Sequence, residues 1–162
     1  LAATNDGVMD EVHTWRADTG ADIVVLAVTD SSSCGIGYTI KNDVTGYPDY
    51  AFAVVRDYCA DVQYTFAHEL GHVMGCCHDA DHPGSCAGGN SLYAYSFGKR
   101  FVGDSGDWRT VMAYTDGSGD PLPWTYYTRI GYFSNPDIEY DGETHTAANL
   151  FDALKEGYYG KF

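Results

Sequence analysis

The chain has 162 residues, of which 44% are hydrophobic and 20% are charged, and its formal net charge is −14. This length suits one domain with a real core, and the composition is that of a soluble globular protein. The acidity excludes binding to nucleic acid or to an anionic membrane, because phosphate contacts need clustered Lys and Arg, and the longest apolar run, residues 23–28, is too short to cross a bilayer.

The first predicted element is a helix over residues 6–18. Val8, Val12 and Trp15 recur there at the i, i+4 and i+7 positions, which share one helix face. We expect this helix to end near Gly20. The sequence opens with neither a signal peptide nor an initiator Met, so we expect Leu1 to mark a processing site or an artificial boundary.

Three strands are predicted next. The continuous β-branched run ADIVVLAV (21–28) indicates a strand buried on both faces, and residues 36–40 and 50–58 indicate a second and a third strand. Residues 41–49, between the second and third strands, are rich in turn-forming residues.

A helix over 60–75 follows, with Asp61 as its candidate N-cap and Gly75 as its stop. Residues 79–143 are rich in Gly, Pro, Asp and Tyr with little periodicity, which is typical of loops around a site. A last helix is predicted from about 144 to 157. We therefore predict one α/β (α+β) domain over 1–162, with a sheet-and-helix subdomain (1–78) and a loop-rich subdomain (79–162).

Residues 68–79 read HELGHVMGCCHD, which is the most specific feature of the sequence. Side chains four residues apart lie on one helix face, so His68 and His72 can donate two imidazole nitrogens to one zinc ion. Glu69 then lies beside the metal, where it suits a base that acts on water. Gly75 can adopt positive φ, and the resulting sharp turn brings His78 back as a third ligand. Three ligands leave the fourth position open, as in catalytic zinc sites.

Three alternatives compete with this interpretation. The histidines could be ordinary helix residues, although the added Gly75 and His78 make chance occurrence of the pattern unfavourable. Cys76 or Cys77 could instead close a structural zinc site, but Glu69 would then have no role. His82 competes with His78 as third ligand, yet it lies beyond the turn and next to a proline.

Five cysteines in so short a chain favour an extracellular protein with about two disulfides. Cys34 and Cys59 flank strand-like sequence, whereas the other three surround the histidine motif. We predict that Cys34 pairs with Cys59 and that Cys86 pairs with either Cys76 or Cys77. The cysteine left over is a candidate for pairing with a propeptide or partner.

The motif HELGHVMGCCHD resembles the extended zinc-binding motif of the metzincin metalloendopeptidases. Its last residue, Asp79, directly follows His78, as is usual in the reprolysin-like branch that the motif resembles. TVMAYT (110–115) resembles the methionine turn of these families. The segments CGIGY, FAVVRDYCA and GYFSNPDIEYDG are most similar to bacterial peptidyl-Asp metalloendopeptidases. The resemblance implies a twisted mixed sheet with an active-site helix. It also implies further elements before residue 6, so we expect an upstream part to be missing or the fold to be reduced.

The same resemblance implies roles for residues outside the histidine motif. Met112 would support the ligands from below as the turn methionine. Tyr114 would stabilise the oxyanion or bind the zinc, and its competing interpretation is a core tyrosine. The implied activity is hydrolysis of peptide bonds by a secreted zinc endopeptidase, with Glu69 as general base. The alternative is a non-catalytic binding or adhesion module that zinc holds together.

The family resemblance says less about the substrates and partners of the protein. The partners implied are protein or peptide substrates and an inhibitory propeptide, and Ca²⁺ is a secondary candidate because of the many carboxylates. Cleavage beside acidic residues would need a cation, for which Arg109 and Arg129 flank the methionine turn. Those arginines are equally suited to surface ion pairs, and Trp108 and Trp124 would suit an apolar pocket.

Overall fold

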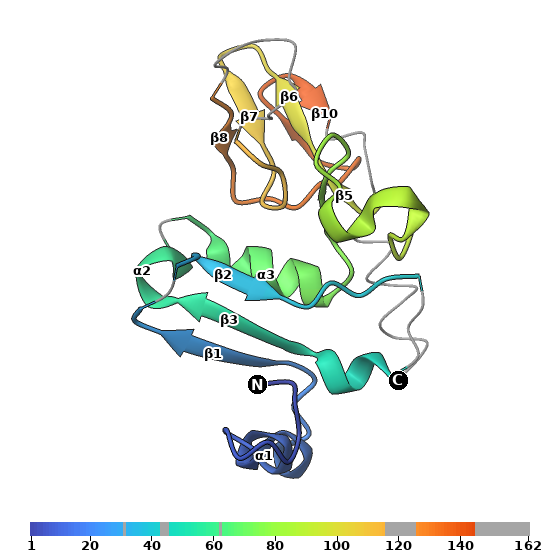
Figure 1. The fold of residues 1–162 in the computed structure, drawn as a ribbon. Coiled ribbons are helices and arrows are strands. Elements are labelled where there is room, and N and C mark those ends of the chain that lie inside the picture. The colour runs from blue at the N-terminus through green and yellow to red at the C-terminus, as the bar shows by residue number, and fades with distance from the viewer. Residues whose placement is uncertain (31, 43–45, 62, 116–125, 145–162) are drawn as a thin grey trace. The chain divides into compact units, whose positions relative to one another are not determined.

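The computed structural model describes residues 1–30, 32–42, 46–61, 63–115 and 126–144 (Figure 1). The protein is a mixed α/β chain with small sheets. It divides into two compact units, the first made of residues 1–38 and 44–73 and the second of residues 39–43 and 74–162. Within the described ranges, none of the helices has the length and apolar character needed to span a membrane. The predicted boundary between residues 78 and 79 stays a prediction.

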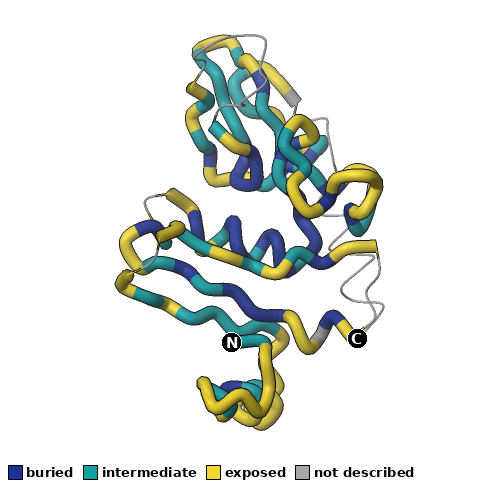
Figure 2. The backbone as a smooth tube through the Cα atoms, viewed as in Figure 1, coloured by how far each residue is buried: buried dark blue, intermediate teal, exposed yellow. Residues whose placement is uncertain are grey.

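The first unit contains a mixed three-stranded sheet with the order β1-β3-β2. The central strand β3 (Phe52–Arg56) pairs in parallel with β1 (Val24–Val28) and antiparallel with β2 (Gly35–Gly37). Figure 2 shows that the buried stretch of this sheet follows β3. The prediction of complete burial for the first strand is wrong, because β1 is an outer strand of this sheet and is only partly buried.

Two helices pack on the sheet of the first unit. Successive residues of a strand point to opposite faces. On one face Phe52 contacts the ring of His13 at a centroid distance of 5.1 Å, and that histidine belongs to α1 (Glu11–Thr19). On the other face Ala53 joins the core cluster of Val73, the last residue of α3 (Thr65–Val73). The sheet therefore lies between α1 and α3.

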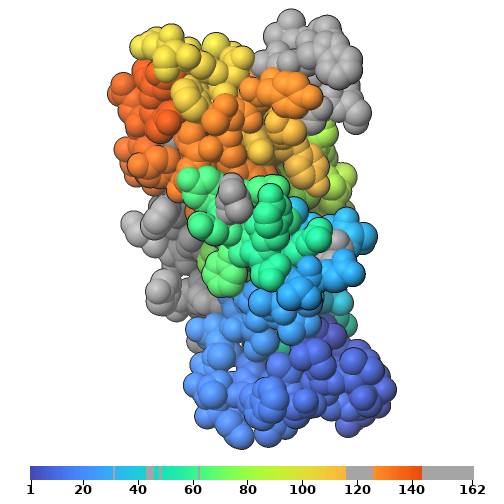
Figure 3. Space-filling view, turned by 90° about the vertical axis from the view of Figure 1, so that its left-hand side faces the viewer, coloured from blue at the N-terminus to red at the C-terminus, as the bar shows by residue number. Residues whose placement is uncertain are grey.

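Helix α1 begins five residues later than predicted. The Asp10 carboxylate accepts a hydrogen bond from the Gly7 N–H at 3.0 Å, and the Asp6 carboxylate accepts one from the Val8 N–H at 2.9 Å. These local bonds hold residues 6–9 in turns. Val8 lies before the helix and is 61% exposed, and Trp15 within the helix is 58% exposed, so the predicted apolar stripe is wrong for both. Figure 3 shows this N-terminal segment in dark blue at the surface.

The ends of α1 and α3 differ in how well they were predicted. Gly20 ends α1 with φ of 65°, as expected. The predicted N-cap Asp61 is wrong, because it follows the short helix α2 (Asp57–Ala60), and α3 begins at Thr65. Tyr64 has φ of 53° and donates its N–H to the Asp61 carbonyl at 2.9 Å. The predicted helix therefore starts too early, and residues 57 and 58, predicted as the end of the third strand, belong to α2 instead.

Where the structure describes the second unit, it shows short strands and one 3-10 segment joined by loops. Its elements are β4 (Cys77–Asp79), η2 (Gly84–Gly89), β5 (Phe97–Gly98), β6 (Arg100–Val102), β7 (Asp107–Arg109), β8 (Thr128–Arg129), β9 (Glu139–Tyr140) and β10 (Glu143–Thr144). Strand β4 pairs with β5, β9 pairs with β10, and the three remaining strands form a sheet of order β6-β7-β8. The 3-10 turn η1 (Tyr47–Tyr50) belongs to the first unit. The predicted helix over 144–157 lies outside the described residues apart from its first position.

Two disulfides are present, as predicted. Cys34 pairs with Cys59 in the first unit, and Cys86 pairs with Cys77 in the second. Cys76 takes part in neither bond and is fully buried, and its burial raises the pKa of the thiol above its ordinary range. The structure therefore selects Cys77 from the two predicted partners of Cys86 and places the remaining thiol away from solvent.

A polar cluster in the second unit is built on Asp141. Its carboxylate accepts hydrogen bonds from the Ser105 N–H and hydroxyl, both at 2.9 Å, and from the indole N–H of Trp108. The Asp104 N–H donates to the Asp141 carbonyl at 2.9 Å. The backbone hydrogen bond from Ser105, followed by that from Trp108, lowers the pKa of Asp141.

This cluster makes a prediction about acid stability. A carboxylate with a lowered folded-state pKa stabilises the fold above its unfolded pKa, about 3.9, and loses that contribution as pH falls through the folded value. Asp141→Asn should therefore destabilise the protein at pH 7, and the difference from wild type should shrink below about pH 3.9. Urea unfolding at several pH values measures this, with Asp18→Asn on α1 as the control. An equal free-energy difference at all pH values would contradict it.

Candidate metal centre

Helix α3 carries the first part of the histidine motif. His68 and His72 lie one turn apart, with ring centroids 4.7 Å apart and an interplanar angle of 89°. Both histidines and the intervening Glu69 are buried. Helix α3 packs against β2 and β3. Both imidazoles thus lie on the buried side of the helix, as four-residue spacing predicts, and the Glu69 side chain is buried beside them.

Gly75 follows the helix and reverses the chain direction. Its φ is 92°, a backbone conformation that side-chain-bearing residues rarely adopt. A Cβ atom at this position would lie 2.5 Å from Cγ2 of Ile40 and 2.6 Å from Cδ2 of Leu92. Both backbone conformation and space therefore require glycine here. The chain then enters β4, which contains His78.

The three predicted metal ligands come together in the structure. His68, His72 and His78 each offer one ring nitrogen, and these nitrogens all lie within 4.8 Å of one another. Nitrogens bound tetrahedrally at about 2.0–2.1 Å from zinc would be roughly 3.4 Å apart, so this set fits such an ion after small movements. Imidazole donors also suit zinc chemically. Among the described residues, no set of three acidic side chains converges in this way, so the predicted Ca²⁺ has no comparable site there.

The competing ligands lie elsewhere. Cys77 is bonded to Cys86, so its sulfur is not available as a thiolate. His82 is hydrogen bonded through Nδ1 to Oδ1 of Asp79 at 2.7 Å and is not one of the three converging residues. Cys76 is also not among the converging residues, so the geometry brings His78, and none of these competitors, to the pair from α3.

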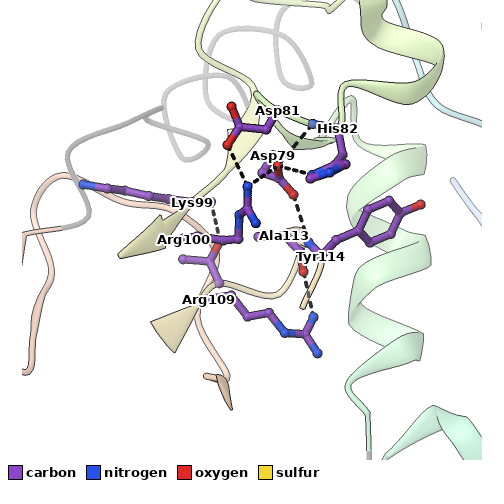
Figure 4. A network of polar contacts seen from close by, with 9 residues as sticks. Asp79, Asp81, His82, Lys99, Arg100, Arg109, Ala113 and Tyr114 are labelled. Atoms are coloured by element: carbon purple, nitrogen blue, oxygen red, sulfur yellow. Dashed lines mark hydrogen bonds and ion pairs between the residues drawn. The ribbon is translucent and has the colours of Figure 1, made fainter. Parts of the chain in front are cut away.

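Asp79 organises the polar contacts beside His78 (Figure 4). Its buried carboxylate accepts hydrogen bonds from the Tyr114 N–H at 3.0 Å and from His82, and it lies 3.7 Å from Nη2 of Arg100. That arginine also contacts Asp81 at 2.7 Å. Burial by itself would raise the pKa of Asp79, but these three partners together lower it. Sequence analysis missed Arg100, because no spacing rule links it to Asp79.

The segment around the predicted methionine turn packs against β4 and β5. The Tyr114 ring lies 4.1 Å from the His78 ring, at an interplanar angle of 33°, and Tyr114 is 42% exposed. Met112 is buried. A Cβ atom on Gly98 would lie 2.6 Å from the Ala113 nitrogen, so the lack of a side chain lets β5 approach the turn. Tyr114 is thus a partly exposed residue beside His78, and it is not a core tyrosine.

The arginines that flank this turn are placed differently. Arg109 donates through Nη1 to the Ala113 carbonyl at 2.7 Å and through Nε to the Tyr127 carbonyl at 2.9 Å. Its guanidinium therefore braces the turn through two backbone carbonyls. Arg129 lies on β8, which pairs in parallel with β7, and its side chain is partly buried.

Several bacterial metalloendopeptidases are similar to this chain in sequence. A peptidyl-Asp metalloendopeptidase of Stenotrophomonas maltophilia is 41% identical over 141 residues, which cover 86% of this chain and 30% of that protein. One from Xanthomonas campestris pv. campestris is 42% identical over 139 residues, covering 86% and 29%. One from Pseudomonas fragi is 39% identical over 83 residues, covering 51% and 49%.

The chain spans about 30% of the length of the first two relatives and about half of the third. The sequence profile of the metallo-peptidase family M12 matches residues 2–134, which include the histidine motif and the segment around Met112. These matches confirm the resemblance to metalloendopeptidases that was drawn from the motifs. The chain therefore belongs to metallo-peptidase family M12.

Proposed function

We propose that this chain is the catalytic domain of a secreted zinc-dependent endopeptidase. The observation that carries the proposal is the convergence of three histidine nitrogens within 4.8 Å in a family M12 chain whose motif places Glu69 between two of them. Secretion is supported by the two disulfides, which are rare in reducing compartments. A propeptide that covers the site before secretion remains part of this proposal.

The roles of the residues follow from their chemistry. His68, His72 and His78 would hold zinc, which when bound supplies Lewis acidity and activates water at neutral pH. The Glu69 carboxylate accepts the proton of the attacking water on one oxygen and delivers it to the departing amine. The Tyr114 hydroxyl would donate a hydrogen bond to the oxyanion. Met112 and Gly75 would support these residues without touching substrate.

We further propose that the substrates are peptides cut beside acidic residues. The similar bacterial proteins carry the name peptidyl-Asp metalloendopeptidase, which points to an aspartate at the cleavage site of those proteins. An acidic side chain would be bound best by an arginine, through charge-assisted hydrogen bonds. Arg109 donates to two backbone carbonyls and braces the turn, so its replacement would disturb the fold; we therefore test Arg129, on β8, as the candidate from the predicted pair.

Glu69→Ala tests the catalytic proposal. Loss of the general base should lower kcat/KM on a protein substrate at least about 10²-fold, whereas zinc content should stay at one per chain because the three histidines remain. Peptidase assays combined with metal analysis of the same samples measure both quantities. Undiminished proteolysis would end the assignment of Glu69, and absence of proteolysis in the wild type would favour the binding-module alternative.

The third ligand can be tested by comparing two histidines. His78→Ala should weaken zinc affinity more than the roughly 10–100-fold typical of an outer-shell partner, because a ligand itself is lost. His82→Ala should have a smaller effect, because His82 contacts Asp79. Competition with a zinc-binding dye measures the affinities. The reverse ranking would assign the ligand to His82.

Cleavage of a mixed peptide library tests the substrate proposal. We expect acidic residues to be enriched directly after the cut bond, and Arg129→Ala to lower kcat/KM for acidic peptides more than for apolar ones. Arg16→Ala on α1 is the control for loss of a positive charge. Enrichment of apolar residues after the cut, unaffected by Arg129→Ala, would contradict the proposal.

A further inference from the structure

Strand β2 consists of Gly35, Ile36 and Gly37, an unusual composition for a strand. Glycine weakens a strand, because it loses the most backbone freedom on folding and offers no side chain for packing. Neither glycine has a positive φ, so backbone conformation does not require glycine at either position. In strands, glycine also marks close approach of another group. Space is therefore the remaining reason for both residues.

The two glycines face the helix that carries the metal motif. Side chains alternate along a strand, and Ile36, between them, is 65% exposed. A Cβ atom on Gly35 would lie 2.6 Å from both Cγ and Oε1 of Glu69, and 2.8 Å from its Cδ. Such distances are too short for any real contact. The Glu69 side chain thus occupies the space that a side chain at residue 35 would need.

Gly37 faces a different part of the same helix. Its Cβ atom would lie 2.8 Å from the backbone oxygen of Glu69, 3.1 Å from Oε2 and 3.3 Å from Cβ of His72. The closest neighbour of Gly37 is therefore backbone, whereas all the close neighbours of Gly35 belong to the Glu69 side chain. A side chain at residue 37 would therefore collide with the helix backbone, whereas a side chain at residue 35 would collide with the Glu69 side chain.

The strand has little freedom to move away from the helix. Gly35 and Gly37 stand opposite Val55 and Ala53 of the central strand β3. Immediately before β2, the Cys34 carbonyl accepts the Arg56 N–H at 2.8 Å, and Cys34 is disulfide-bonded to Cys59. A methyl group on residue 35 would therefore displace the Glu69 side chain more readily than it would displace the strand.

We propose that Gly35 is a positioning residue for Glu69, and this inference rests on the proposed role of Glu69 as the base. Because residue 35 has no side chain, the Glu69 carboxylate can lie between its own helix, α3, and the backbone of β2. The strand limits the rotamers of Glu69 and thereby holds its oxygens in one place. Misplacement of a reacting group by about 1 Å can reduce the rate about 10²-fold.

A double-mutant cycle on stability tests the contact independently of activity. Gly35→Ala should lower the Tm of the zinc-loaded protein by roughly 3–10 °C, as overpacking does. In a Glu69→Ala background, the atoms that collide are gone, so the same change should leave the Tm unchanged or raise it. Gly37→Ala is the matched control. It should lower the Tm in both backgrounds, because the Glu69 carbonyl oxygen remains.

An equal loss of Tm from Gly35→Ala in both backgrounds would overturn the proposal. If Gly35→Ala does not fold, the double variant decides: a folded double variant supports the contact, and an unfolded one overturns it. No measurable Tm change from Gly35→Ala in the wild-type background would also overturn it.

Activity provides the second arm. Folded, zinc-loaded Gly35→Ala should lose kcat about 10²-fold with little change in KM, because substrate binding does not require the Glu69 carboxylate in place. Unchanged kcat would overturn the positioning role. If Glu69→Ala itself keeps full activity, the proposed function fails, while the stability cycle still reports whether the two residues are in contact. The two failures are thereby distinguishable.

Discussion

The end of helix α3 is the constraint on which the candidate site depends. Only five residues separate His72 from His78, so the chain must leave the helix and reverse direction within a single turn. The φ of 92° at Gly75 allows this reversal, and the side chains of Ile40 and Leu92 fill the space that any Cβ atom there would need. Before the turn, the Tyr47 hydroxyl lies 3.1 Å from the Val73 carbonyl and satisfies one of the helix-terminal acceptors. We therefore expect a residue other than glycine at position 75 to move His78 away from His68 and His72.

Polar contacts then hold β4, the strand that follows the turn at Gly75. The Asp79 carboxylate takes hydrogen bonds from a backbone N–H and from an imidazole, and it lies close to a guanidinium, so its burial is compensated. Because Asp79 directly follows His78, these contacts limit movement of β4. Residues that orient ligands in this way commonly decide how well a metal is held. Arg109 has a similar effect on the neighbouring turn through the Ala113 carbonyl.

Local patterns predicted the parts of the site that lie within one turn of chain. Four-residue spacing placed His68 and His72 on one side of a helix, and Gly75 marked the reversal. The positions of the helix starts were mispredicted, because they depend on turns at Tyr64 and Asp10 that periodicity does not report.

Contacts between segments that are far apart in the chain could not be predicted from the sequence either. Asp79 meets Tyr114 across 35 residues, and Gly35 meets Glu69 across 34, with no periodic signal linking either pair. The sequence predicted a strand over residues 36–40 without a role for its glycines, and only the packed helix shows what fills the space beside Gly35 and Gly37. The choice of Cys77 over Cys76 likewise depended on which residue the folded chain brings to Cys86.

That choice has a consequence for how the protein matures. Neighbouring residues in extended chain point in opposite directions, so a bond from Cys86 to Cys76 would require the segment before His78 to present its other side to η2. The burial that raises the Cys76 pKa also keeps this thiol protonated, and a protonated thiol does not attack the adjacent disulfide. Oxidative folding and the position of His78 are thus linked, because the disulfide isomer that forms sets which way the segment before His78 faces.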